Sequence, residues 1–592
     1  MSFKDLRVKF LIWRLKYLNN RTFIIILSAL IGVISGFAAV VLKELVHFIQ
    51  QLLTGGFNIE YANLLYLSYP LLGILVTSLV AKYIFRENLG HGITTILYII
   101  SKRSSIVKRT MMFSRMVTSA ITVGFGGSVG LEAPIVVTGS AIGSNIGSVM
   151  HLNYKKRTLL IGCGAAAAVS AIFNSPVAGV IFSLEVILAE ATISTFIPLL
   201  ISSVFGSLVS LTLLGEHVLF SFRLRDNFIA ADVPFYILLG IICGLVSVYF
   251  TRVTYRVERF ISRVKNNLGR VLTGGILLGL IIFIFPPIYG EGYDTIKALL
   301  AGDTTNVFSR SLFFDEIENT GFLLLFLFGV LLIKPIASSL TIGSGGSGGI
   351  FAPSLFIGGV TGFLFSNTIN FFYGSNVVST SNFTLVGMCG VMSGVLYAPL
   401  TAIFLIAEIT SGYQLFVPLM LVSAIAYNTG SFFEKHSLYT KNLIESGDLI
   451  QYDKDRQVLS LINMKKIVEK DLLQIHPKAT LGELVDLVKI SKRNIFPVVN
   501  EKQELAGIIT LDDIRDIMFD SELRERTTIE TLMHSPPATV SSHENMQSVM
   551  SKFEVTQAWN LPVIDNGKYV GFVSKSRIFN TYRNKLISQH KE

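Results

Sequence analysis

The sequence has few charged residues and few cysteines for its length. Only 15% of the 592 residues are Asp, Glu, Lys or Arg, whereas 51% are hydrophobic, and the mean hydropathy is +0.58. This composition excludes an ordinary soluble globular protein and predicts a polytopic membrane protein. The three cysteines, Cys163, Cys243 and Cys389, stand singly in apolar segments. They indicate packing rather than disulfides or a metal site.

Several glycine-rich or apolar segments lack a residue that a nucleotide-binding or cation-binding site would require. The run "GSGGSG" at 343–348 fits a dinucleotide-binding fingerprint, but no acidic residue follows it until Glu408. That gap argues against a Rossmann site, and the absence of a Walker lysine argues against an ATP-driven pump. The apolar segments also lack the clustered carboxylates that a divalent-cation transporter would need. No catalytic residues and no metal ligands are predicted.

Apolar stretches long enough, or nearly so, to cross a bilayer core of about 30 Å recur along the first three quarters of the chain. They are Thr22–Val40, Leu64–Ala81, Ser194–Leu214, Val233–Phe250, Val271–Phe285 and Gly321–Ala337. The net charge of +10 could suggest a nucleic-acid partner. Its lysines and arginines, however, cluster in the connections at 102–109, 155–157 and 252–265, a pattern that predicts cytoplasmic loops and no nucleic acid. The charged, amphipathic residues 1–21 are expected to form a cytoplasmic N-terminal helix, not a signal peptide.

One acidic residue stands in an uncharged stretch. Glu132, in "GGSVGLEAPIVVTG", is the sole residue with a formal charge between Arg115 and Lys155. A carboxylate in such a setting is costly unless it has partners or a function. The alternative is that a helix N-terminus merely favours a glutamate there.

The membrane part contains an internal repeat. "FNSPVAGVIFSLEV" at 173–186 matches "LYAPLTAIFLIAEI" at 396–409, with Pro and Glu at the same separation in both copies. Upstream, "GLEAP" at 130–134 matches "GIFAP" at 349–353, and "GHG" at 90–92 matches "GEG" at 290–292. Two halves with helices broken at corresponding positions predict a transporter whose site lies between the repeats, near mid-membrane.

The broken helices predict an anion site. Glycine followed by an Ala-Pro pair and an apolar run is typical of a loop that enters a helix, where free backbone N–H groups and the helix dipole attract negative charge. From Pro335 to Ala407 there is no Asp, Glu, Lys or Arg, so binding there must rely on backbone dipoles and hydroxyls. The Glu132 carboxylate is itself an anion, and it could occupy the site until it is protonated or displaced.

In their order along the chain, these residues resemble the voltage-gated chloride channel (CLC) family of anion channels and chloride/proton exchangers. "GHGIT", "GLEAP" and "GIFAP" are similar to the family's three anion-binding motifs, and Tyr439 in "SLYTK" is similar to the tyrosine that closes the inner end of its path. The resemblance implies an all-α membrane fold with two inverted-topology repeats, and a homodimer with one pore per subunit, gated by Glu132. It also implies that the anion is bound by His91, Gly92, Ile350, Phe351 and Tyr439.

The sequence departs from the family pattern in three places. His91 stands where chloride-selective members usually have Ser, and Thr94 replaces a Pro, so selectivity among chloride, nitrate and fluoride stays open. The His91 imidazole could donate to the anion, or its ring could point away while the backbone binds. In the second motif Ala133 replaces a Gly and Leu131 a basic residue. At the position of the glutamate that relays protons in many exchangers stands Val186, which favours passive conduction, and neighbouring Glu185 points about 100° away.

Charged, soluble sequence follows the membrane part from residue 445. "IFPVVN" then "GIITLDDI", at 495–500 and 507–514, is echoed by "LPVIDN" then "GFVSKSRI", at 561–566 and 571–578. This resembles a pair of CBS (cystathionine-beta-synthase-type) domains, a cytoplasmic α/β tail, with copies expected at about 463–520 and 527–585. The resemblance implies that Thr510 and Asp513 hold the ribose of an adenine nucleotide. The second copy keeps Ser574 but has Arg577 for the acid, and a purely structural tail stays open.

Together these observations predict transport of chloride or similar small anions by residues 22–444, with repeats at about 22–215 and 233–440. Channel-like conduction is favoured, and a chloride/proton exchanger with a different internal proton route is the alternative. A CBS-tailed divalent-cation transporter, or a membrane-anchored enzyme or nucleotide sensor, would be distinguished by the absence of anion flux into liposomes. The expected location is the cell (inner or plasma) membrane, with both termini cytoplasmic and lipid around the apolar helices. No cofactor is required.

Overall fold

The computed structural model describes residues 14, 16–54, 59–87, 89–90, 92–188, 193–215, 226–302, 320–374, 377–410, 412–446, 448 and 462–591. The chain consists of two compact units, Met1–Leu449 and Ile450–Glu592. His91 and most of the N-terminal helix expected over residues 1–21 lie outside the described residues.

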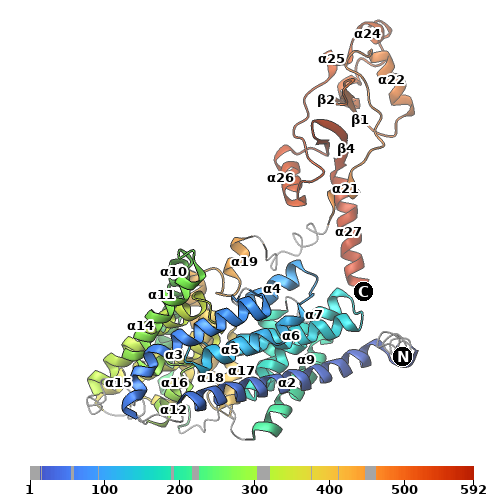
Figure 1. The fold of residues 1–592 in the computed structure, drawn as a ribbon. Coiled ribbons are helices and arrows are strands. Elements are labelled where there is room, and N and C mark those ends of the chain that lie inside the picture. The colour runs from blue at the N-terminus through green and yellow to red at the C-terminus, as the bar shows by residue number, and fades with distance from the viewer. Residues whose placement is uncertain are drawn as a thin grey trace. The chain divides into compact units, whose positions relative to one another are not determined.

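The first unit is helical throughout its described part (Figure 1). Its first half contains α2 (Asn20–Thr54), α3 (Ile59–Leu79), α4 (Gly92–Lys102), α5 (Ser114–Gly124), α6 (Glu132–Val149), α7 (Tyr154–Phe173), α8 (Pro176–Phe182) and α9 (Ile193–Leu214). Its second half contains α10 (Val233–Ser262), α11 (Asn267–Ile284), α12 (Tyr293–Ala301), α14 (Thr320–Gly343), α15 (Phe351–Tyr373), α16 (Thr380–Leu396), α17 (Pro399–Ile409), α18 (Phe416–Phe433) and α19 (Lys441–Glu445).

The expected membrane spans are present as helices. Within the described residues, nine helices are long and apolar enough to cross a membrane, and the six predicted apolar stretches fall on α2, α3, α9, α10, α11 and α14. Shorter apolar helices, including α8, α16 and α17, lie between them. The predicted all-α polytopic membrane fold is confirmed.

The two halves pack in the same way. Helix α6 packs on α7, and α15 packs on α16, both through glycines. A Cβ added to Gly139 of α6 would lie 2.2 Å from the Gly164 carbonyl oxygen of α7, and one added to Gly358 of α15 would lie 2.4 Å from the Gly387 carbonyl oxygen of α16. Small residues allow such close backbone contact between membrane helices. The repeat in the sequence therefore corresponds to a repeated helix pair.

The helices that follow also end alike. The C-cap residue of α7 is Asn174, with φ of 52°, and the C-cap residue of α16 is Tyr397, with φ of 58°. A left-handed backbone is uncommon for any residue other than glycine and most unusual for a large one, yet it recurs at the matched position. In each half it turns the chain directly into a helix that begins with proline, at Pro176 and Pro399.

The second unit is a small α/β structure built from two similar copies. The first contains α21 (Met464–Ile467), α22 (Leu481–Ile490), β1 (Ile495–Val499), β2 (Leu505–Thr510) and α23 (Leu511–Ile514), and α24 (Ser521–Arg526) follows it. The second contains α25 (Ile529–Leu532), α26 (Met546–Thr556), β3 (Asn560–Asp565), β4 (Lys568–Ser574) and α27 (Lys575–Lys591). Strands β1 and β2 pair antiparallel, as do β3 and β4, and each pair has a register shift at the same place.

The two copies exchange short segments. Ile475 bridges to β1 and Val540 bridges to β3, both in parallel. Glu469, near the start of the first copy, bridges to Phe572 of β4 in the second copy, whereas His534, near the start of the second copy, bridges to Ile508 of β2 in the first. Each sheet is thus completed by the other copy. The predicted order of strand, turn, strand and helix start is confirmed in both.

Candidate functional site

The loops that lead into α6 and α15 are joined by backbone hydrogen bonds. The N–H of Gly130 donates to the Gly349 carbonyl at 2.9 Å, and the N–H of Gly349 donates to the Gly130 carbonyl at 2.9 Å. The flanking bonds follow the same symmetry: Ser128 N–H donates to Thr341 Oγ1 at 3.2 Å, and Ser347 N–H donates to Thr122 Oγ1 at 3.0 Å. The "GLEAP" and "GIFAP" motifs therefore meet, and the two helix N-termini begin at one place inside the unit.

Glu132 lies at this junction and is 1% exposed. Its Oε1 accepts a hydrogen bond from the Tyr293 hydroxyl of α12. Its Oε2 lies beside Gly130, because a Cβ built on Gly130 would be 2.1 Å from Oε2 and 3.1 Å from the backbone nitrogen of Ala352. The carboxylate that begins α6 thus faces the N-terminus of α15, where backbone N–H groups favour negative charge.

The other predicted anion ligands surround the same junction. Ile350 is the N-cap residue of α15 and Phe351 is its first residue; the Phe351 ring is fully buried and stacks on Phe173 with ring centroids 5.5 Å apart. Tyr439 is 2% exposed, and its buried hydroxyl has no hydrogen-bond partner among the described residues. A buried polar atom without a partner is costly. This hydroxyl is therefore available to a ligand.

The first predicted motif is described only in part. Gly92 begins α4 and packs against α6, since a Cβ on it would lie 2.7 Å from Val137 Cγ2; His91, one residue earlier, lies outside the described residues. Thr94, which departs from the family's proline, donates its hydroxyl to the Tyr439 carbonyl at 3.0 Å. The replacement thus ties α4 to the segment that carries Tyr439, a bond that proline could not make.

Two charged residues of the second half were not among the predicted site residues. Glu291, in the "GEG" segment, accepts the Leu131 N–H at 3.0 Å. Lys334 of α14 is fully buried, and its Nζ donates to the carbonyls of Gly290 at 3.0 Å and Ile288 at 3.1 Å. The available signals were a glutamate between two glycines and a lysine inside an apolar span.

The second pair of matched glutamates has a structural role. Glu408 of α17 accepts the N–H groups of Val177 and Ala178, at the start of α8, at 3.0 and 2.9 Å. Glu185, which follows α8, accepts the N–H groups of Leu400 and Thr401, at the start of α17, at 3.2 and 2.9 Å. Each glutamate therefore caps the N-terminus of the matched helix in the other half of the unit. The two glutamates at matched positions of the repeat make the same kind of hydrogen bond.

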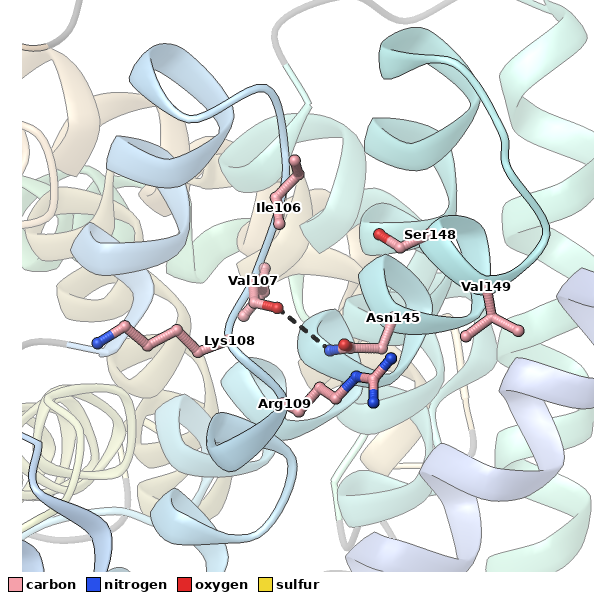
Figure 2. Close-up of a pocket in the computed structure, with 7 residues that line it drawn as sticks. All are labelled: Ile106, Val107, Lys108, Arg109, Asn145, Ser148 and Val149. Carbon is pink, nitrogen blue, oxygen red and sulfur yellow. Dashed lines mark hydrogen bonds between the residues drawn. The ribbon is translucent and has the colours of Figure 1, made fainter. Parts of the chain in front are cut away.

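A pocket of about 350 Å³ lies at the other end of α6 (Figure 2). It is lined by Ile106, Val107, Lys108, Arg109, Asn145, Ser148 and Val149. Figure 2 shows Lys108 extending away from the other side chains, while the Asn145 amide donates to the Val107 carbonyl at 3.3 Å. Asn145 lies 13 residues after Glu132, about 20 Å along a helix. This pocket is separate from the junction, and its basic residues suit the negative end of α6.

Comparison with known proteins agrees with this arrangement. The sequence pattern of the family described as "Voltage gated chloride channel" matches residues 72–431, which include α4, α6, α12 and α15. The chain belongs to this family. The pattern of the CBS domain matches residues 464–520 and 529–584, so the tail contains two CBS domains.

Relatives and solved structures of this voltage-gated chloride channel family extend the comparison. The chain is 27% identical over 557 residues to "Chloride channel protein CLC-f" of Arabidopsis thaliana, covering 83% of this chain and 69% of the relative. It is 28% identical over 434 residues to "H(+)/Cl(-) exchange transporter ClcA" of Yersinia pestis, covering 70% and 86%. The crystal structure of a eukaryotic CLC transporter superposes with a TM-score of 0.60 at 19% identity, covering 94% of this chain and 97% of that one.

The predicted nucleotide ligands of the first CBS domain are bonded to each other. Asp513 Oδ2 accepts the backbone N–H and the hydroxyl of Thr510, both at 2.7 Å, and lies 3.1 Å from His534 Nε2. Partial burial alone would raise the pKa of Asp513, but the hydrogen bonds from Thr510 and the contact with His534 outweigh it and hold this pKa below its ordinary value. In the second domain Ser574 donates to Glu469 Oε1 at 2.6 Å.

Proposed function

We propose that this protein moves chloride or similar small anions across a membrane, through a path in each subunit of a homodimer, with Glu132 as the gate. The observation that carries the proposal is the buried Glu132 carboxylate at the N-terminus of α15, opposite the paired loops of the two halves. A carboxylate in this position competes with an external anion for the same N–H groups. When a proton neutralises Glu132, the side chain loses its attraction to the helix and the anion takes its place.

The anion site itself would be formed by dipoles without a formal positive charge. In the proposal, the N–H groups of Ile350 and Phe351 and the Tyr439 hydroxyl hold the central anion, and His91 and Gly92 line its path from the side of α4. Neutral donors bind an anion without trapping it, which rapid passage requires. The unpartnered Tyr439 hydroxyl supports this assignment.

We propose passive conduction as the mode of transport. Val186, on the π-helical segment Ser183–Ile187, replaces the internal carboxylate of many exchangers, and valine cannot carry a proton. Glu185 is not a substitute because its carboxylate is bonded to the start of α17. The Yersinia relative is named a proton/chloride exchanger, so proton coupling is the second candidate.

Two measurements in liposomes test this function. Chloride efflux from the reconstituted wild-type chain should rise as the pH falls, and Glu132→Gln should conduct at every pH without that dependence. Glu44→Gln, at an exposed position of α2, is the matched control and should keep the wild-type profile. A Glu132→Gln variant with unchanged pH dependence would remove Glu132 from its role.

Simultaneous pH recording distinguishes the two modes of transport. Passive conduction predicts that a chloride gradient moves no protons uphill. Uphill proton movement would reject conduction and support the exchanger.

In this proposal the chain resides in the cell (inner or plasma) membrane with both termini in the cytoplasm, because the basic connections follow the positive-inside pattern.

The first CBS domain is the proposed site for an adenine nucleotide. Thr510 and Asp513 would exchange their hydrogen bonds with each other for hydrogen bonds to the ribose. Titration of the full chain with ATP, followed by protection of residues 505–534 from hydrogen exchange, tests this; an absence of protection leaves the tail a structural role.

A further inference from the structure

Glu132 has almost no contact with water in this structure. It is 1% exposed, and its Oε1 is engaged by the Tyr293 hydroxyl. A gate that opens on protonation needs a route for its proton when its own carboxyl is enclosed, and a second ionisable side chain can provide one. The question is which ionisable side chain lies between Glu132 and solvent.

Glu291 lies next to Glu132 on the side of α12. Its Oε1 accepts the N–H of Leu131, the residue directly before Glu132, at 3.0 Å. It also stands two residues before Tyr293, whose hydroxyl donates to Glu132. Unlike Glu132, Glu291 is only partly buried. It therefore has both contact with the gate segment and access to solvent.

The backbone holds Glu291 in this position. Lys334 Nζ donates to the carbonyls of Ile288 and Gly290, and Gly290 and Gly292 have φ of +61° and +88°. A side chain at Gly292 would also collide with Phe356, 2.5 Å from the built Cβ. A fully buried lysine is expensive unless its charge is compensated. Here the Lys334 ammonium group interacts with the Glu291 carboxylate as well as with the loop carbonyls.

The charged and titratable groups that face Glu291 come from four elements. They are Glu132 from α6, Tyr293 from α12, Lys334 from α14 and Lys43 from α2, with Lys297 of α12 acting on Lys43. Two carboxylates in one site repel each other when both are ionised, so a proton on either affects the other.

We propose that Glu291 is the carboxylate through which Glu132 exchanges protons with the aqueous phase, and that the two titrate as a pair. Glu291 takes a proton from a hydronium ion, which becomes water, and passes it to Glu132; the O–H bond on Glu291 breaks as the O–H bond on Glu132 forms, and Glu291 returns to its ionised form. The neutral Glu132 then leaves the N-terminus of α15. This inference rests on the gating role proposed for Glu132.

Chloride efflux against pH in liposomes containing the full chain tests the proposal. Glu291→Gln keeps an oxygen for the Leu131 N–H but removes the negative charge, so Glu132 binds its proton less tightly. The midpoint of acid activation should move to lower pH by about one unit. Lys43→Gln removes a positive charge that faces Glu291 and should move the midpoint to higher pH.

Asp294→Asn is the matched control. Asp294 lies three residues after Glu291, and its side chain is fully exposed, so this variant should keep the wild-type midpoint. An unchanged midpoint in Glu291→Gln overturns the inference, and if that variant does not elute as a folded protein, an unchanged midpoint in Lys43→Gln overturns it. If Glu132→Gln retains the wild-type pH profile, the gating proposal itself fails, whatever the Glu291 variant does.

Discussion

At the scale of single residues, the site depends on the absence of a side chain at Gly130. A methyl group there would lie 2.1 Å from Glu132 Oε2 and 2.8 Å from Ala352 Cβ, closer than nonbonded atoms approach. Gly130→Ala should displace the Glu132 carboxylate from α15 and weaken the pH dependence of chloride efflux. Gly90→Ala is the control, because no atom of the described residues lies within 4 Å of a Cβ at Gly90. Wild-type pH dependence in Gly130→Ala would contradict the described position of the carboxylate.

A second residue-scale prediction concerns Asp513. Its pKa is lowered in the folded tail, so its bonds stabilise the fold above its ordinary pKa of about 3.9 and this contribution is lost as the pH falls through the lower, folded value. Asp513→Asn should destabilise the capped turn by about 1 kcal/mol at pH 7. The difference from wild type should shrink as the pH falls below the ordinary pKa and disappear once it is below the lowered, folded pKa.

Hydrogen exchange of residues 505–514 in the full chain, corrected for the intrinsic exchange rate at each pH, measures this effect. A difference between the variant and wild type that persists unchanged into acid would contradict the ionic origin of the cap.

Sequence reasoning found Glu132 but not the groups around it, for a physical reason. An isolated acid in an uncharged stretch is visible in one dimension. Glu291 and Lys334 become significant only because folding brings the segment before α12 to the start of α6, and Lys334 of α14 to that segment. Their charges lie more than 150 residues away along the chain. In a similar way, the replacement of proline by Thr94 is understood only from its bond to the Tyr439 carbonyl.

At the scale of helices, the repeated Pro and Glu predicted matched elements but not the partner of each glutamate. The structure pairs them crosswise: Glu408 caps α8 and Glu185 caps the start of α17. Two hydrogen bonds from backbone N–H groups to a carboxylate are lost when either glutamate becomes alanine.

Glu185→Ala and Glu408→Ala should therefore each lower the free energy of unfolding by about 2 kcal/mol. Denaturant titration of the purified chain measures this loss, with the exposed Glu44→Ala as the control. Neither variant should change the number of protons moved per chloride. A changed proton ratio in Glu185→Ala would give this residue a transport role and contradict its assignment as a cap.

At the scale of the whole molecule, the order of the motifs was sufficient to predict two membrane halves followed by a repeated α/β tail. The exchange of segments within the tail was not predictable, because Glu469 and His534 stand outside the strand patterns that mark the two copies. The meeting of the two halves at Gly130 and Gly349 follows from the inverted repeat. It brings together the features of the proposed path: two helix N-termini, one enclosed carboxylate and the buried Tyr439 hydroxyl, which has no hydrogen-bond partner in the described part of the chain.

The most direct test of this account is to locate the anion. Crystals of the wild-type chain and of Glu132→Gln grown in bromide would reveal bound anions by anomalous scattering. The account predicts bromide between the N–H groups of Ile350 and Phe351 and the Tyr439 hydroxyl in both, and a further bromide in Glu132→Gln where the carboxylate lies beside Ala352. Bromide absent from both places, or bound elsewhere in the unit, would contradict it.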